Sequence, residues 1–187
     1  MVQGRGIDAS LNELGRRQSE AFFKAYKRVD FDKIYVSSLK RTQESVQGFI
    51  DMEIPFEKLS GLDEISWGNH EGQSFDPEMH KRYTDCIDDW QMGKLDSAVG
   101  GGESPNQVMT RQGEAMDYIL SKDDEETILI CMHGRAMRIL ICWLLDYDLT
   151  EMEQFEHENL CLYELDYDGD SYELIRANDT DHMANLS

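Results

Sequence analysis

The most constraining feature of the chain is a strand-like run that ends in His-Gly and continues into a helical pattern. Residues 127–132 form an uncharged, largely apolar run after two glutamates, which predicts a strand buried on both faces. His133 and Gly134 end this run, and a helix is expected to begin within a residue or two of the glycine. Its apolar residues recur at helical spacing: Ala136, Ile139, Leu140, Trp143 and Leu144.

This strand-to-helix junction predicts a binding site for an anion. The first N–H groups of a helix have no partner within the helix and lie at the positive end of its dipole. Phosphate is a common ligand there. A lone histidine at such a place is more often a hydrogen-bonded structural residue. His133, however, follows a core strand at its carboxyl end, where open α/β sheets bind ligands. We therefore interpret His133 as a proton donor or a nucleophile.

The charge of the chain restricts its partners. Asp and Glu outnumber Lys and Arg by 38 to 18, and the formal net charge is −20. Such a chain repels nucleic acid and anionic lipid, so we expect neither nucleic acid nor a membrane as a partner. A phosphorylated substrate is also repelled at long range, so any phosphate site must be a local basic concavity.

Length and cysteine pattern indicate one cytoplasmic domain. Residues 1–187 suit a single domain with a core of its own, and no repeat, low-complexity segment or linker divides them. The four cysteines show no C-x-x-C pairing, which favours a reduced, cytosolic protein. We identify no signal peptide and no apolar segment of membrane length.

The remaining pattern alternates helices with short strands. Helices are expected from about residue 12, over 39–51 and after a Ser104 cap, and residues 74–99 are partly helical. Strands are expected over 33–37, 160–165 and 172–175, and residues 56–65 are mostly extended. This order predicts an α/β three-layer sandwich with a mixed, mostly parallel sheet and helices on both faces.

A second strand-to-helix junction occurs at residues 37–45 and carries Arg41 in its first helical turn. A cation there opposes the helix dipole, so local stability does not explain it. A phosphate or carboxylate opposite Arg41 would explain it, because the guanidinium group binds such anions bidentately. Taken alone, Arg41 is better explained as a surface arginine paired with one of the many carboxylates.

Residues 62–72 supply a candidate proton donor. The segment combines carboxylic acids with apolar residues, an aromatic residue and two glycines. A buried carboxylic acid beside an anion site can protonate a leaving alkoxide, because burial raises its pKa. Glu64, which has apolar and aromatic neighbours, is the better candidate, whereas Asp63 and Glu71 are expected to be solvated.

Other kinds of site fit less well. Cysteine-dependent phosphatases carry an arginine six residues after the nucleophilic cysteine, but Met137 stands six residues after Cys131. No segment shows a recognisable spacing of metal ligands. Three further histidines have acidic, exposed-looking surroundings and are expected to be inert: His80, His157 and His182.

Five segments in order resemble the histidine phosphatase superfamily, which has the phosphoglycerate mutase-like fold. They cover nearly the whole chain, and each is weak alone but specific in combination. The segments are the glycine-rich loop and helix at 3–18, Ser-Ser-Leu-Lys-Arg-Thr at 37–42, Leu-x-Glu with its two glycines at 62–72, Gly-Glu-Ser at 102–111, and His133-Gly134.

The resemblance implies a phosphohistidine mechanism without a metal or organic cofactor. Glu64 would protonate the leaving oxygen. Arg41, His133 and the N–H groups near Gly134 would neutralise charge on the phosphoryl oxygens. Gln3 and Gly4 match a substrate-contacting loop.

The resemblance breaks down at the N-terminus. Members of the family open with a central strand that ends in Arg-His-Gly, whose histidine is phosphorylated, and this chain contains no Arg-His-Gly. We expect this first central strand to be absent and to leave a gap in the sheet, which a strand from a second copy would fill in a homodimer. We also expect the chain as given to be inactive. An internal methionine assigned as the start, a shortened chain and a relative without the nucleophile remain alternatives.

The reaction class follows from the segment after Glu64. Residues 73–100 are short and acidic, whereas mutases of this family carry a longer segment there that encloses the substrate. We therefore expect a phosphomonoester hydrolase acting on a small phosphorylated metabolite. The alternatives are a cofactor-dependent phosphoglycerate mutase and a non-catalytic relative that binds a phosphate ligand.

Overall fold

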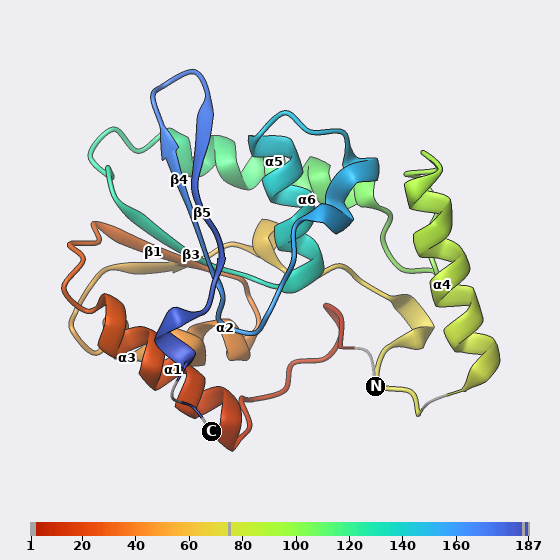
Figure 1. Ribbon diagram of the computed structural model, residues 1–187, viewed down its shortest axis with the longest axis horizontal. Helices are drawn as coiled ribbons and strands as arrows, with labels where there is room; N and C mark the ends of the chain where they lie inside the picture. The colour runs from red at the N-terminus through yellow and green to blue at the C-terminus, as the bar shows by residue number, and fades with distance from the viewer. Residues whose placement is uncertain (1–2, 75, 185, 187) are drawn as a thin grey trace.

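The structure is a computed structural model and describes residues 3–74, 76–184 and 186 (Figure 1). The helices are α1 (Glu13–Tyr26), α2 (Lys40–Ser45), α3 (Gln47–Ile50), α4 (Pro77–Gln91), α5 (Pro105–Leu120) and α6 (Gly134–Leu144). The strands are β1 (Lys33–Val36), β2 (Phe56–Lys58), β3 (Ile128–Cys131), β4 (Leu162–Tyr167) and β5 (Tyr172–Asp179). Short 3-10 helices span Ser60–Leu62, Gly68–His70, Leu149–Gln154 and Asp181–Met183.

The strands form two sheets. β1, β2 and β3 make a parallel sheet in the order β2-β1-β3, in which Ile34 is paired with Phe56 on one side and with Leu129 on the other. β4 and β5 form an antiparallel hairpin of their own. The parallel and antiparallel strands that we expected in one mixed sheet are therefore separate in the described part of the chain.

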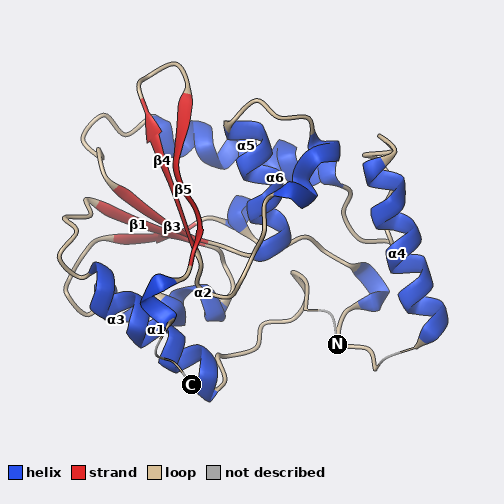
Figure 2. Ribbon diagram, viewed as in Figure 1, coloured by secondary structure: helices blue, strands red, loops and turns tan. Residues whose placement is uncertain are grey.

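Helices cover both faces of the parallel sheet, which confirms the three-layer α/β architecture (Figure 2). Successive side chains of a strand point to opposite faces. Ile34 and Val36 accordingly pack with Phe22 of α1 and Phe49 of α3. Tyr35, between them in sequence, packs on the opposite face with side chains of α5 and α6: Ala115, Met116, Ile119 and Leu140.

β1 is more deeply buried than β3. Ile34, Tyr35 and Val36 are fully buried, whereas Ile128 and Ile130 of β3 are only half-buried. β3 is hydrogen-bonded to β1 along one edge, and no other strand of the described residues pairs with its second edge. Side chains of β3 pack on both faces of the sheet as predicted, Leu129 on one and Ile128 and Ile130 on the other. They are less buried than predicted, because the apolar run alone does not determine the number of neighbouring strands.

Local signals set the beginnings of the helices as predicted. Asn12 caps α1 by accepting the Gly15 N–H, and Ser104 and Gln107 form a reciprocal capping box at α5. The helix predicted over 39–51 is instead two helices, because Val46 leaves the helical conformation between α2 and α3 with φ −112° and ψ 14°.

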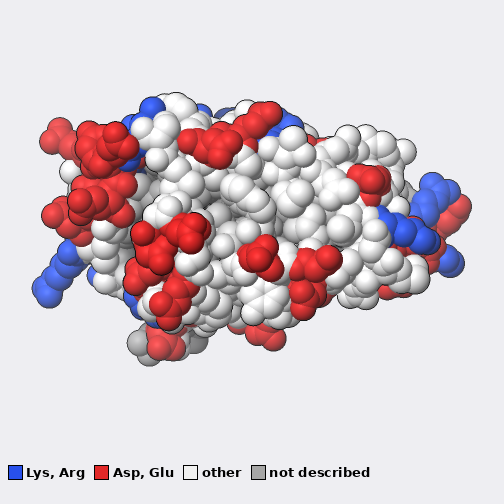
Figure 3. Space-filling model, turned by 90° about the horizontal axis from the view of Figure 1, so that it is seen from above, with Lys and Arg blue, Asp and Glu red and all other residues white. Residues whose placement is uncertain are grey.

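Acidic residues dominate the surface. On the face shown in Figure 3 the acidic side chains are spread along its length, while basic ones gather mostly toward the two ends. No helix within the described residues is both long and apolar enough to cross a membrane.

Candidate active site

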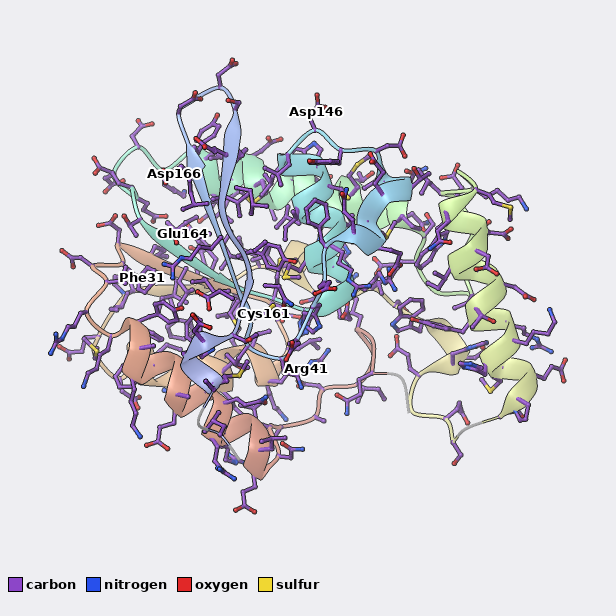
Figure 4. The ribbon with its side chains drawn as sticks, in the orientation of Figure 1. Phe31, Arg41, Asp146, Cys161, Glu164 and Asp166 are labelled. Atoms are coloured by element: carbon purple, nitrogen blue, oxygen red, sulfur yellow. The ribbon has the colours of Figure 1, made fainter. Side chains whose placement is uncertain are left out.

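The parallel pairing of β1 and β3 brings the two strand-to-helix junctions together. Val36 and Cys131 are paired at the ends of their strands, so the residues that follow them share one edge of the sheet. Arg41 lies in the first turn of α2, and His133 is the N-cap residue of α6. The Arg41 Nε atom lies 3.2 Å from His133 Nδ1. Figure 4 shows Arg41 well inside the outline of the molecule.

The hydrogen bonds of His133 assign its tautomer. Arginine donates only, so the Nδ1 atom that faces Arg41 must be an acceptor, and the ring proton is on Nε2. Nε2 lies 2.8 Å from the Ser37 hydroxyl oxygen and donates to it. The Ser37 oxygen in turn lies 2.9 Å from the Thr42 hydroxyl, which donates to the Leu39 carbonyl at 2.8 Å. This chain of hydrogen bonds fixes the orientation of the imidazole.

His133 is neutral in this arrangement. Burial lowers the pKa of His133 from its usual value of 6.5 to about 3, and the positive charge of Arg41 acts in the same direction. A neutral imidazole with both nitrogens hydrogen-bonded presents no free lone pair. His133 therefore orients Arg41, and it can donate to an anion once its Nε2 N–H exchanges the Ser37 oxygen for an oxygen of the anion.

The remaining donors of Arg41 hold the N-terminal loop. Its Nη1 atom donates to the Ile7 carbonyl at 2.6 Å, and its Nη2 atom to the Gly4 carbonyl at 3.4 Å. The expected grouping of Gly4 with Arg41 is thus present. Gln3 is exposed and forms no hydrogen bond with the other described residues.

Glu64 is buried at the beginning of α6. One carboxylate oxygen accepts the N–H groups of Ile65 and Ala136, each at 2.9 Å, and the other lies 3.3 Å from the N–H of Arg135. Burial raises the pKa of Glu64, while these N–H donors and Arg41 act in the opposite direction. The raised pKa makes Glu64 a better candidate proton donor than an exposed glutamate.

Asp63 is not solvated, and this part of the prediction is wrong, whereas Glu71 is half-buried. Asp63 is only 2% exposed and accepts hydrogen bonds from the N–H and hydroxyl of Ser38 at 2.7 Å and from Arg5 at 3.1 Å. Glu71 accepts the N–H groups of Gly6 at 2.6 Å and Trp67 at 2.8 Å. Both carboxylates receive donors from segments distant in sequence, which the local sequence did not reveal.

The Gly-Glu-Ser segment supports the strand-like stretch that carries Glu64. Glu103 forms an ion pair with Arg111 at 2.9 Å and accepts the Ser66 N–H at 2.9 Å. Arg111 also donates to the carbonyls of Gly61 at 2.7 Å and Glu64 at 3.2 Å. The segment therefore fixes the backbone around Glu64, in addition to starting α5.

His157 lies at the site although its sequence surroundings predicted an inert, exposed residue. Its ring is half-buried against Gly134, where an added Cβ would lie 2.8 Å from the ring atoms Nδ1 and Cε1. Burial and the charge of Arg138 lower the pKa of His157. The contact joins residues 23 positions apart, so no local pattern could have identified it. His182 lies elsewhere, against Phe22 and Tyr26.

The cluster offers anion-binding and proton-transfer groups. Within residues 3–74, 76–184 and 186, no group of three or more His, Cys, Asp or Glu side chains is arranged to hold a metal ion. A guanidinium group, an imidazole, a buried carboxyl group and a helix N-terminus are the components with which proteins bind and transfer phosphoryl groups.

The sequence model of the histidine phosphatase superfamily (branch 1) matches residues 1–180. The chain belongs to the histidine phosphatase superfamily. The family model spans the segments that carry the site, from the N-terminal loop to β5. The resemblance seen in the five sequence segments is therefore confirmed.

Relatives and solved structures agree with this assignment. The chain is 24% identical to phosphoserine phosphatase 1 of Hydrogenobacter thermophilus, over 95% of the chain and 84% of the relative. It is 25% identical to a metal-independent phosphoserine phosphatase of Arabidopsis thaliana, over 74% and 59%. Among solved structures, YhfR of Bacillus stearothermophilus superposes with a TM-score of 0.85 at 26% identity, over 97% and 90% of the two chains. The α-ribazole phosphatase of Shigella flexneri shares the fold, with a TM-score of 0.82 at 21% identity over 96% and 88%.

Proposed function

We propose that the site binds the phosphoryl group of a small phosphorylated metabolite and supports hydrolysis of its phosphomonoester bond. The observation that carries the proposal is the convergence of Arg41, His133 and Glu64 at the edge where β1 and β3 end. Two of these residues supply hydrogen-bond donors for phosphoryl oxygens, and the third supplies a proton for the leaving group.

The proposed reaction has two steps. An imidazole nitrogen attacks phosphorus, the P–O ester bond breaks, and the leaving alkoxide takes the proton of Glu64. Water then attacks the phosphohistidine and gives a proton back to Glu64, the N–P bond breaks, and inorganic phosphate leaves. Arg41, His133 and the Gly134 N–H stabilise the charge on the non-bridging oxygens in both steps.

The attacking imidazole is assigned by the family resemblance to the histidine of an Arg-His-Gly motif, which residues 1–187 do not contain. We accordingly propose that the 1–187 chain alone binds the phosphoryl group without turning it over. An in-frame Arg-His-Gly run directly before the Met1 codon would exclude the alternative of a non-catalytic binding protein.

The relatives favour hydrolysis over mutase chemistry. Those at 24% and 25% identity are phosphoserine phosphatases, and a fructose-2,6-bisphosphatase of Mus musculus is 29% identical over 64% of the chain. We propose that the substrate is about as large as those named for these relatives, that is, a small metabolite that carries one or more phosphate esters. Phosphoserine and a phosphorylated sugar are the first ligands to compare.

The test uses a chromogenic phosphomonoester in the presence of EDTA, with the 1–187 chain and its Arg41→Ala and His133→Ala variants. We expect no turnover by any of them, and a rise in the melting temperature of the parent with phosphate or vanadate that Arg41→Ala abolishes. Turnover by the parent that His133→Ala removes would mean that His133 acts directly, and the role proposed here would be wrong. Failure of phosphate and vanadate to stabilise the parent would overturn the proposed function.

The open edge of β3 supports a further proposal, a homodimer in which a neighbouring copy supplies a strand to this edge. Within the described part of the chain, β3 is paired only on its β1 side. Unpaired strand edges favour pairing with another chain. Light scattering coupled to size-exclusion chromatography should give a mass that rises toward twice 21.6 kDa with concentration. A monomer at every concentration would contradict the dimer.

We also propose a cytoplasmic location. All four cysteines are free: Cys86, Cys131, Cys142 and Cys161. Free thiols are typical of reducing compartments. Fractionation of cells that express a tagged copy of the natural gene tests this location.

A further inference from the structure

The loop that carries His157 is held in place by contacts at both of its ends. Phe155 is buried in the core beside α6, and the Tyr163 hydroxyl donates to the Glu156 carbonyl at 2.6 Å. The Cys161 N–H donates to the Glu158 carbonyl at 3.1 Å, which closes a turn. His157 is therefore a positioned residue, although it belongs to neither a helix nor a strand.

The loop places the imidazole beside the first residue of α6. The His157 ring contacts Gly134, and only a glycine allows this approach, because a Cβ there would lie 2.8 Å from two ring atoms. Glu64 already accepts the N–H groups of Arg135 and Ala136. Among the described residues, the Gly134 N–H has no acceptor. An oxygen bound to that N–H would lie next to both His133 and His157.

Titratable and charged groups from α6 and from its own loop act on His157. From α6 it faces His133 and Arg138, and from its own loop it faces Glu158. Burial and Arg138 disfavour a positive charge on the ring, whereas Glu158 favours it. A dianion bound at the Gly134 N–H would add negative charge beside the ring. The protonated form of His157 would then be favoured.

We propose that His157 is a phosphoryl-binding residue, which takes up a proton when a dianion binds and then donates a hydrogen bond to one of its oxygens. The inference rests on the proposed function, since it requires the anion site at Gly134. It adds a ligand from the segment before β4 to the donors supplied by α2 and α6. Arg41 and His133 bind the dianion in the protonation states that they have in the free protein. His157 instead changes its protonation state on binding.

Isothermal titration calorimetry with sulfate at pH 7.5 tests the proposal, because sulfate is a tetrahedral dianion that does not titrate in this range. Titration in two buffers with different ionisation enthalpies gives the number of protons taken up. We expect close to one proton for the parent and close to none for His157→Gln. We also expect His157→Gln to bind sulfate on the order of tenfold more weakly, the loss of one charge-assisted hydrogen bond. Glu156→Gln, an exposed neighbour in the same loop, is the matched control and should behave as the parent.

A second variant guards against misfolding of His157→Gln. Gly134→Ala keeps the imidazole but displaces it by its new Cβ, so it should also lose proton uptake while retaining Arg41 and His133. Sulfate binding with undiminished proton uptake in both variants would overturn the role of His157 and leave the proposed function standing. No sulfate binding by the parent would overturn the proposed function, and the role of His157 with it.

Discussion

Charged side chains serve different purposes at the carboxyl ends of β1 and β3 and along α4. Beside these strand ends, Asp63 and Glu64 of the segment after the Ser60–Leu62 3-10 helix are buried and accept several hydrogen bonds each. On α4, Lys81 pairs with Asp85 at 2.6 Å and Arg82 with Glu78 at 2.5 Å, and these side chains are largely exposed. The same residue types are therefore fixed in place in one region and solvated in the other.

The difference lies in what happens when one partner is removed. An exposed ion pair is replaced by water, and the pair contributes little to stability. When a buried carboxylate is removed, its hydrogen-bond donors lose their acceptor, and each unpaired donor carries a desolvation penalty. Substitutions at the strand ends should accordingly change binding and stability, whereas those on α4 should change neither.

The largest effect is expected for Arg41→Ala. The substitution removes the bidentate donor of the site and also releases the carbonyls of Gly4 and Ile7. We expect phosphate affinity to fall by roughly 100-fold or more, since charge-assisted bidentate pairs are among the strongest polar contacts. Thermal shift against phosphate concentration measures it. Arg41→Lys keeps the positive charge but lacks the planar guanidinium group that binds two oxygens at once, so it should retain only part of the affinity.

Asp63→Ala should destabilise the fold. It removes a buried carboxylate, leaves the Ser38 N–H and hydroxyl without this acceptor and removes the partner of Arg5. We expect a loss of about 2–3 kcal/mol in the free energy of unfolding. Urea denaturation measures it, with Asp85→Ala on α4 as the matched control. Equal effects of the two substitutions would remove the distinction between the two regions.

His133 should make stability depend on pH. Its folded-state pKa of about 3 lies below its usual value of 6.5, so the unfolded state binds more protons between these values. The contribution of His133 to the free energy of unfolding has its full value above pH 6.5. It falls as the pH drops, by up to about 1.4 kcal/mol per pH unit. His133→Gln should flatten that part of the profile in urea melts between pH 7 and 5. An unchanged slope would show that His133 is charged in the folded state.

Glu64 should give a dependence of the opposite sign. Burial raises its pKa in the folded state, so the unfolded state loses its proton first as the pH rises, and stability falls above the unfolded pKa. Glu64→Gln carries no such proton, so its stability relative to the parent should increase between pH 4.5 and 8. The difference between paired denaturation curves at the two pH values measures this, and a constant difference would contradict a raised pKa.

The smallest effect is expected for Arg82→Ala. Its partner Glu78 lies one turn away on the same exposed face of α4. We expect a change of at most about 0.5 kcal/mol in the free energy of unfolding and no change in phosphate affinity. A large loss of phosphate affinity would mean that α4 contributes to the site.

The sequence predicted the grouping of candidate residues where it depends on local pattern or on the family resemblance. His133 was selected because it follows a strand, and Arg41 was assigned to the site through the resemblance. The pairing of β1 with β3 brings the two residues together. Glu64 was selected by its apolar neighbours, and it is buried. The beginning of α1 near residue 12 and the Ser104 cap of α5 were predicted from a few adjacent residues.

What the sequence missed depends on contacts between distant segments. Asp63 is buried because Ser38 and Arg5, 25 and 58 positions away, supply its donors. His157 reaches Gly134 only through the path of the loop before β4. The half-buried state of β3 depends on which strands pair with it, and an apolar run carries no information on that number.

The acidic surface has a kinetic consequence for a chain that captures anions. A net charge of −20 repels an incoming phosphate ester before it reaches Arg41, so the rate constant of encounter is lowest in dilute buffer. Added salt screens this repulsion over roughly 10 Å at 0.1 M. Association of a phosphorylated ligand should therefore become faster as ionic strength rises, opposite to the behaviour of enzymes that attract their substrates through a basic surface.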